Sequence, residues 1–151
     1  MKNLLFILFI SLLSFASYAQ MAQNPVLWSI SYYDLKNGEA ELVYTANIEA
    51  KWHIYSQRAT DAGPIPTTFS ITVSKDFTLL GKVEEQNAHE EYVKAFEAKV
   101  FVFEKQAIFK QKIKRLNKNS FKIKSTVEYM TCNDSQCLPP KTIDLDITVP
   151  K

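Results

Sequence analysis

The two cysteines of the chain are the residues whose type and spacing best suit chemistry. Cys132 and Cys137 are separated by four polar residues and followed by Leu-Pro-Pro. Such a pair could form a structural disulfide, a redox-active disulfide or part of a metal site. A metal site is not expected, because His53 and His89 do not lie at the spacing of a metal-binding motif relative to the cysteines and no further thiols are available. A thioredoxin-type site is excluded, since the spacing is not C-x-x-C and no helix follows whose N-terminus could stabilise a thiolate.

A disulfide between these cysteines is geometrically plausible but would stabilise the fold only modestly. If the flanking strands are antiparallel neighbours, both cysteines lie near the top of one hairpin, within the roughly 4.4 to 6.8 Å Cα separation of disulfides. Closing a loop of about six residues contributes only about 2 kcal/mol in the entropy model. A disulfide in an exposed turn is also accessible to an attacking thiolate. The spacing therefore leaves both a structural bond and a redox pair open.

The remaining sequence is that of a globular domain. The chain has 151 residues, 46% hydrophobic and 23% charged, so it can bury a core, and this composition argues against disorder. This length predicts a single domain. Two cysteines are too few for a disulfide scaffold, and a domain of this size does not need one.

The first residues predict a secretory signal peptide over residues 1–19. A short positive start precedes an apolar run from Leu4 to Phe15, and small residues at Ser17 and Ala19 suit cleavage after Ala19. An uncleaved membrane anchor is the weaker alternative, because the run is shorter than the ~20 residues of a bilayer span. We therefore expect residues 20–151 to be exported as a periplasmic domain with no direct membrane insertion. An oxidising compartment would let the cysteines pair.

The net charge of +2 argues against electrostatic binding of nucleic acid or anionic lipid. A local basic stretch runs from Lys105 to Lys124. Its bases alternate with apolar residues, which is typical of the solvent face of a half-buried hairpin; these are Phe109, Ile113, Phe121 and Ile123. An acidic partner surface is the alternative explanation.

Apolar residues recur at every second position from Leu27 onward, which indicates β-strands. The clearest strands are expected over residues 40–49, 120–130 and 143–149. Weaker patterns predict strands over residues 27–33, 52–56, 67–73, 77–83, 99–103 and 107–114. Short strands with frequent turn signals and no crossover helices predict an all-β fold, and we favour an immunoglobulin-like antiparallel β-sandwich.

Residues 84–98 do not follow the strand pattern. Ala88, Tyr92 and Phe96 recur at steps of four, which suits a short helix, although no clear cap is present. A long, partly irregular connection in such a chain is often functional. The plainer alternative is a surface helix or omega loop with Tyr92 and Phe96 anchored in the core.

Three stretches resemble the N-terminal periplasmic domain of the thiol:disulfide interchange protein DsbD. Residues 127–142 resemble its cysteine hairpin, with the pattern Tyr-x-x-Cys followed by Cys-x-Pro-Pro. Residues 51–56, Lys-Trp-His-Ile-Tyr-Ser, are similar to the aromatic strand beside its active site. Residues 89–92, His-Glu-Glu-Tyr, are similar to the acidic and aromatic start of its cap loop.

The resemblance implies an immunoglobulin-like domain that relays electrons through one cysteine pair, with protein-disulfide reductase-type activity and no cofactor. Electrons would come from a membrane thiol transporter domain and pass to thioredoxin-fold periplasmic proteins. Because the sequence ends at Lys151 without a membrane domain, the relay is expected to act in trans. By position, Cys137 attacks the substrate disulfide and Cys132 resolves the mixed disulfide.

The resemblance also implies a cap over the cysteine pair. Glu90, Glu91, Tyr92 and Phe96 fall in the cap stretch, and Tyr92 or Phe96 would be its aromatic shield. Glu90, Glu91 and Asp134 near the pair would disfavour a thiolate. His53 and Tyr55, if they lie on the adjacent strand, could donate a hydrogen bond to a sulfur.

A rival hypothesis is a secreted immunoglobulin-like binding or adhesion module whose disulfide is purely structural. A carbohydrate-binding sandwich is a third possibility, but it relies on Trp28 and Trp52, which we expect in the core. Nucleophilic hydrolysis has no support, since neither histidine lies in a recognisable triad context.

Overall fold

The computed structural model describes residues 24–58 and 63–151. The predicted signal peptide and its cleavage site lie outside these residues. Within the two described ranges, no helix has the length and apolar character needed to cross a membrane.

Antiparallel strands make up most of the described chain, as predicted. One sheet has the order β1 (Val26–Asp34), β2 (Glu39–Ile48), β8 (Gln106–Arg115) and β5 (Phe77–Gln86). A second group comprises β12 (Lys141–Asp144), β10 (Ser125–Tyr129) and β4 (Thr68–Ile71), with β13 (Ile147–Val149) paired to β9 (Phe121–Ile123). A third sheet has the order β11 (Thr131–Cys132), β3 (His53–Tyr55), β7 (Ala98–Glu104) and β6 (His89–Val93).

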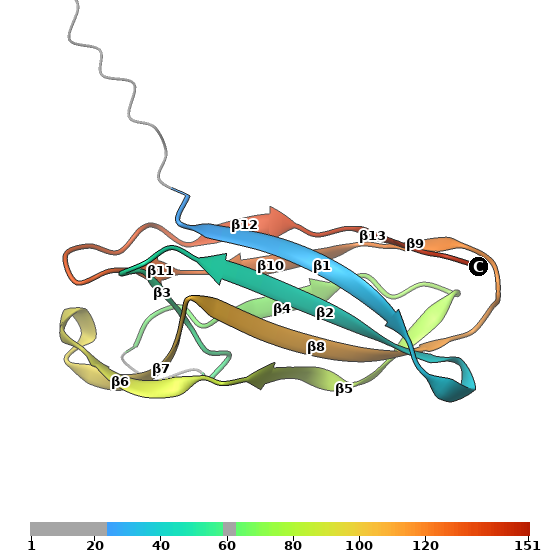
Figure 1. Cartoon of the computed structure of the whole chain (residues 1–151), viewed down its shortest axis with the longest axis horizontal. Helices are drawn as coiled ribbons and strands as arrows, with labels where there is room; N and C mark the ends of the chain where they lie inside the picture. Colours follow the sequence, from blue (N-terminus) through green and yellow to red (C-terminus); the bar gives the residue numbers. More distant parts are fainter. Residues whose placement is uncertain (1–23, 59–62) are drawn as a thin grey trace, which may run out of the picture.

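The β1-β2-β8-β5 sheet forms one layer of a sandwich, and β12, β10, β4, β13 and β9 form the other (Figure 1). Aromatic side chains join the layers at the centre, where the Trp28 ring lies 5.8 Å from that of Phe109 and 5.4 Å from that of Tyr129. Trp52 is also buried in this core. The predicted all-β, immunoglobulin-like sandwich is confirmed, and both tryptophans contribute to its packing.

The basic stretch at 105–124 is half-buried as predicted, but it is not one hairpin. β8 pairs with β2 and β5, whereas β9 pairs with β13. The apolar residues of both strands face the core, and bases on β8 form ion pairs with β2, including Lys110 with Glu41 at 3.3 Å. The two strands therefore separate into different sheets because each buries its apolar face from its own side of the core.

The prediction of a helix or irregular connection over 84–98 is wrong. β5 continues to Gln86, and β6 pairs with β7 from His89 opposite Val102 to Val93 opposite Ala98. The connection between β6 and β7 contains only a 3₁₀ turn, η3 (Lys94–Phe96). Val93 takes the buried position on β6, so Tyr92 is 56% exposed and is not anchored in the core.

The β6–β7 turn and the loop after β11 lie at the same end of the sandwich, at the left of Figure 1. The C-terminus lies at the opposite end. The strands of the third sheet, β11, β3, β7 and β6, lie at the left end of Figure 1. This end therefore holds the cysteines and the segments that were expected to cap them.

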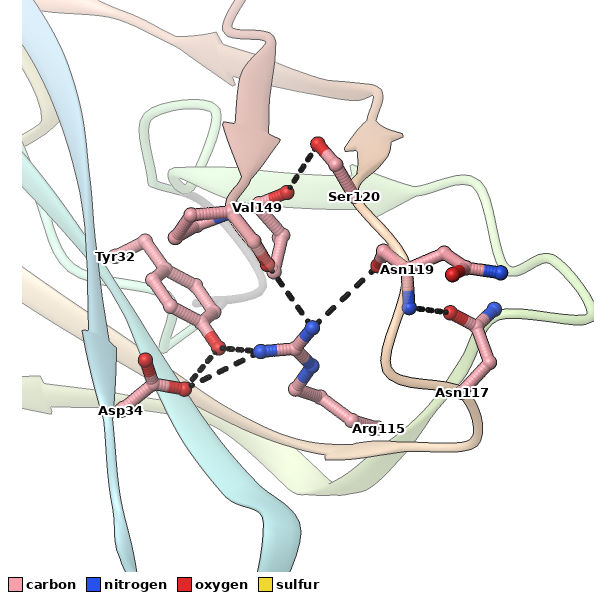
Figure 2. Close-up of polar contacts among 8 residues, drawn as sticks. Tyr32, Asp34, Arg115, Asn117, Asn119, Ser120 and Val149 are labelled. Carbon is pink, nitrogen blue, oxygen red and sulfur yellow. Dashed lines mark hydrogen bonds and ion pairs between the residues drawn. The ribbon is translucent and has the colours of Figure 1, made fainter.

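At the end of the fold opposite the cysteines, the Arg115 side chain contacts residues of several segments (Figure 2). Its side chain is 13% exposed and forms an ion pair with Asp34 at 3.6 Å. Its guanidinium donates to Tyr32 Oη at 3.4 Å and to the carbonyl of Pro150 at 2.9 Å. Arg115 therefore links β8 to β1 and to the end of β13.

Replacing Arg115 with alanine should lower the free energy of unfolding by about 2 kcal/mol, since it breaks several charge-assisted hydrogen bonds in a half-buried site. Arg115→Lys should recover only part of this loss, because an ammonium group lacks the planar fork that serves several acceptors. Urea unfolding measures both, with the exposed Lys112 of the same strand, changed to alanine, as control. Equal losses of unfolding free energy in Arg115→Ala and Lys112→Ala would contradict the role of Arg115 in linking β8 to β1 and β13.

Candidate active site

Cys132 and Cys137 form a disulfide that closes a tight polar turn. Their Cα atoms are 4.0 Å apart, slightly closer than the range expected from the sequence, and the two residues pair as an antiparallel bridge. Asn133 Oδ1 accepts hydrogen bonds at 2.9 Å from the backbone N–H groups of Ser135 and Gln136. Its own N–H donates to the Gln136 carbonyl. Asparagine in this role fixes the turn that brings the cysteines face to face.

The strands around the turn position it as the sequence predicted. β10 pairs antiparallel with β12, with Tyr129 opposite Lys141, so the cysteines lie beyond the end of this pair. The Leu138 N–H donates to the Thr131 carbonyl at 2.9 Å and extends the pairing toward the disulfide. The disulfide thus lies at the end of a hairpin whose register is already set by the core strands.

The two cysteines differ in exposure. Cys132 is 1% exposed and packs in a small apolar cluster with Tyr55 and the valines Val93, Val100 and Val102. Cys137 is half-buried and lines a cleft at the surface. Of the two cysteines, Cys137 is therefore the one nearer to solvent.

β3 presents His53 and Tyr55 beside the disulfide. Cys132 lies directly opposite His53 in the β11–β3 ladder, and His53 Nε2 is 3.0 Å from Tyr55 Oη. Burial lowers the pKa of His53, while the carboxylates of Glu91, Glu104 and Asp134 act in the opposite direction. Burial also raises the pKa of Tyr55 far above its usual value, so its hydroxyl stays protonated. Both side chains are on the adjacent strand, as the sequence suggested.

The η3 turn covers the cluster with one aromatic residue. Phe96 packs against the cluster that contains Cys132, and its ring meets the Tyr55 ring edge-on at a centroid distance of 6.0 Å. Tyr92 lies at the rim of the cleft with its side chain largely in solvent. Of the two aromatic residues expected in the cap, only Phe96 packs against the apolar cluster around Cys132.

A cleft of about 690 Å³ opens beside Cys137. β6 and the start of η3, from Glu91 to Lys94, line one part, and loop residues 133–137 line another, with the buried His53 also contributing to the lining. Glu91 and Asp134 thus face the same cleft as predicted. Glu90 does not line it, because its carboxylate pairs with Lys99 at 3.0 Å on the outer side of β6.

Two features of the site were not expected from the sequence: the apolar residues around Cys132 and one acidic neighbour of His53. Val100 and Val102 alternate along β7 and surround Cys132, a pattern visible in the sequence as every second residue of that strand. Glu104 follows in the same alternation and lies opposite His53. Its position depends on the pairing of β7 with β3, for which the sequence carries no separate signal.

Comparisons with known proteins agree with this geometry. The family model for the N-terminal domain of the thiol:disulfide interchange protein DsbD matches residues 22–148. Among curated proteins, no sequence matches the chain. The N-terminal periplasmic domain of ScsB from Proteus mirabilis has a TM-score of 0.61 at 11% identity, over 83% of this chain. The chain spans only 47% of that protein's chain.

Two solved structures from Neisseria meningitidis are also similar. The reduced DsbD N-terminal domain has a TM-score of 0.50 at 12% identity, over 81% of this chain and 86% of that one. A complex of the DsbD and PilB N-terminal domains has a TM-score of 0.49 at 11% identity, over 79% and 80%. The match of the family model over nearly the whole described chain confirms the resemblance found in the cysteine hairpin. The chain belongs to the family of the N-terminal domain of the thiol:disulfide interchange protein DsbD, whose members act in thiol:disulfide exchange.

Proposed function

We propose that this domain is a periplasmic module that passes electrons from a membrane thiol transporter domain to thioredoxin-fold proteins. The observation that carries the proposal is the asymmetric disulfide, in which Cys137 is half-buried and lines an open cleft whereas Cys132 is buried. Exchange needs one accessible sulfur and a second thiol nearby to resolve the mixed disulfide. The description of the ScsB neighbour as a periplasmic domain supports the location.

Each transfer to a partner moves two electrons and two protons. The Cys137 thiolate attacks one sulfur of the partner disulfide, and the other partner sulfur leaves with the electron pair and takes up a proton. Cys132, as a thiolate, then attacks Cys137 and forms the Cys132–Cys137 bond. The partner's second sulfur leaves and is protonated, so the partner departs as a dithiol and this domain is oxidised.

The surroundings of the pair limit exchange with other thiols. Glu91 and Asp134 line the same cleft as Cys137, and their negative charges make a thiolate on Cys137 less favourable. Phe96 packs against the apolar cluster around Cys132. A docking partner would displace these groups or neutralise them, so exchange is fastest inside the complex.

Replacing Cys132 with alanine should trap partners as mixed disulfides through Cys137. The variant keeps the accessible sulfur but lacks the resolving thiol, so the covalent complex persists. Non-reducing gels of the variant incubated with an oxidised exported thioredoxin-fold protein should show a new band that disappears on reduction.

Cys137→Ala is the matched control, since it leaves only the buried sulfur and should form little of the complex. Absence of a band with Cys132→Ala, or equal bands with the two variants, would contradict the proposed roles.

A further inference from the structure

His53 lies in a row of three side chains that crosses three strands. In the ladders of β11, β3 and β7, Cys132 is directly opposite His53, and His53 is directly opposite Glu104. Residues directly opposite one another in antiparallel strands have side chains on the same face, with Cβ atoms about 4.5 to 5.5 Å apart. The sheet therefore places the side chains of Cys132, His53 and Glu104 next to one another on one face.

The imidazole is held in a defined environment. It is 8% exposed, and its Nε2 atom is 3.0 Å from the Tyr55 hydroxyl on its own strand. Charged and titratable groups face it from each neighbouring element: Glu91 and His89 on β6, Glu104 on β7 and Asp134 in the cysteine loop. The carboxylates favour a positive charge on the ring, whereas burial disfavours it.

We infer that His53 takes up the proton of the Cys132 thiol in the resolving step and that Glu104 stabilises the resulting imidazolium. This inference rests on the proposed function. Cys132 is buried, so water cannot readily remove its proton, and a positioned base beside the sulfur replaces it. A nucleophile, a base and a third group that supports the base form the general arrangement for activating a weak nucleophile.

The proton balance of the step closes within the site. With Nε2–H of His53 donating to Tyr55 Oη, the Cys132 S–H proton moves to Nδ1 of His53, and the Cys132 sulfur attacks Cys137 and forms the disulfide. The bond from Cys137 to the partner sulfur breaks, and the electron pair leaves on that sulfur. His53 then returns the proton to the departing thiolate. Because burial lowers the pKa of His53, the ring is neutral at neutral pH and can accept the proton.

Reaction of the reduced protein with the aromatic disulfide DTNB separates the two steps. Attack by Cys137 releases one thionitrobenzoate, and resolution by Cys132 releases a second. His53→Gln should slow the second release about 100-fold at neutral pH and leave the first unchanged, since a general base typically contributes 10²–10⁴ in rate. The slowed rate should rise about tenfold for each pH unit as hydroxide replaces the base.

Glu90→Gln, whose carboxylate pairs with Lys99 on the outer side of β6, is the matched control and should leave the second release unchanged. Glu104→Gln changes an exposed side chain and should shift the pH midpoint of the second release downward, because Glu104 favours the charged imidazole. If wild type shows no second release, the proposed function fails. If wild type shows it and both His53→Gln and Glu104→Gln retain the wild-type pH profile, only the role of His53 is overturned.

Discussion

Replacing both cysteines with alanine will lower the free energy of unfolding by no more than about 2 kcal/mol and will abolish electron transfer to an oxidised partner. The small stability effect follows from the short loop, because closing about six residues removes little entropy from the unfolded chain. The central core lies between other strands, with Trp28, Phe109 and Tyr129 in contact there. Urea unfolding of the oxidised wild type and the double variant measures the difference.

The reduction potential of the cysteine pair is a second test of whether the disulfide adds little stability to the fold. A disulfide that adds little stability to the fold is lost at little cost, so its potential should lie above about −300 mV, the range below which structural disulfides fall. Equilibration with glutathione or dithiothreitol buffers, followed by alkylation of free thiols, gives the value. Cys132→Ser with Cys137→Ser should behave like the alanine pair in the unfolding experiment.

The rival binding or adhesion module makes the opposite prediction. Its disulfide would only fasten a turn, so the double variant would keep its function and the potential would fall below about −300 mV. Ser135→Ala, in the same turn, is the control for local disturbance, since it leaves both sulfurs in place. Unchanged function in the double variant together with a low potential would favour the rival.

The strand pattern could be predicted where one face of a strand is buried and the other is not. On β2 the apolar set from Ala40 to Ile48 alternates with polar and half-buried residues, and the structure buries that set. The position of the cysteine turn followed in the same way, because strong strand patterns flank it on both sides. Burial on one face thus carries enough information to place both the core strands and the disulfide.

Strand β6 and the row of Cys132, His53 and Glu104 could not be predicted, because both depend on which strands pair. The spacing of Ala88, Tyr92 and Phe96 imitates a helix, yet pairing with β7 provides backbone hydrogen bonds that a strand requires and overrides this local signal. Likewise, His53 and Glu104 are brought together only by strand register. A shift of one residue would move Glu104 to the other face.

Replacing Phe96 with alanine will speed reduction of the disulfide by a small thiol about tenfold. The ring packs against the Cys132 cluster and meets Tyr55 edge-on. Such aromatic contacts contribute about 0.5–1.5 kcal/mol, and 1.4 kcal/mol corresponds to about a tenfold change in an equilibrium. If attack on the sulfurs requires a local opening of the η3 turn, loss of the ring makes the open form about ten times more frequent. Stopped-flow reduction by dithiothreitol measures the rate.

Tyr92→Ala is the matched comparison, because the other aromatic residue of the expected cap is 56% exposed. A surface substitution of this kind should change the rate by about twofold or less. The two variants therefore separate the alternatives left open by the sequence, in which either aromatic ring could shield the pair. A faster reaction in Tyr92→Ala than in Phe96→Ala would transfer the shielding role to Tyr92. Equal rates in both variants and wild type would mean that access to Cys137 does not depend on the cap, and that the acidic cleft alone limits exchange with small thiols.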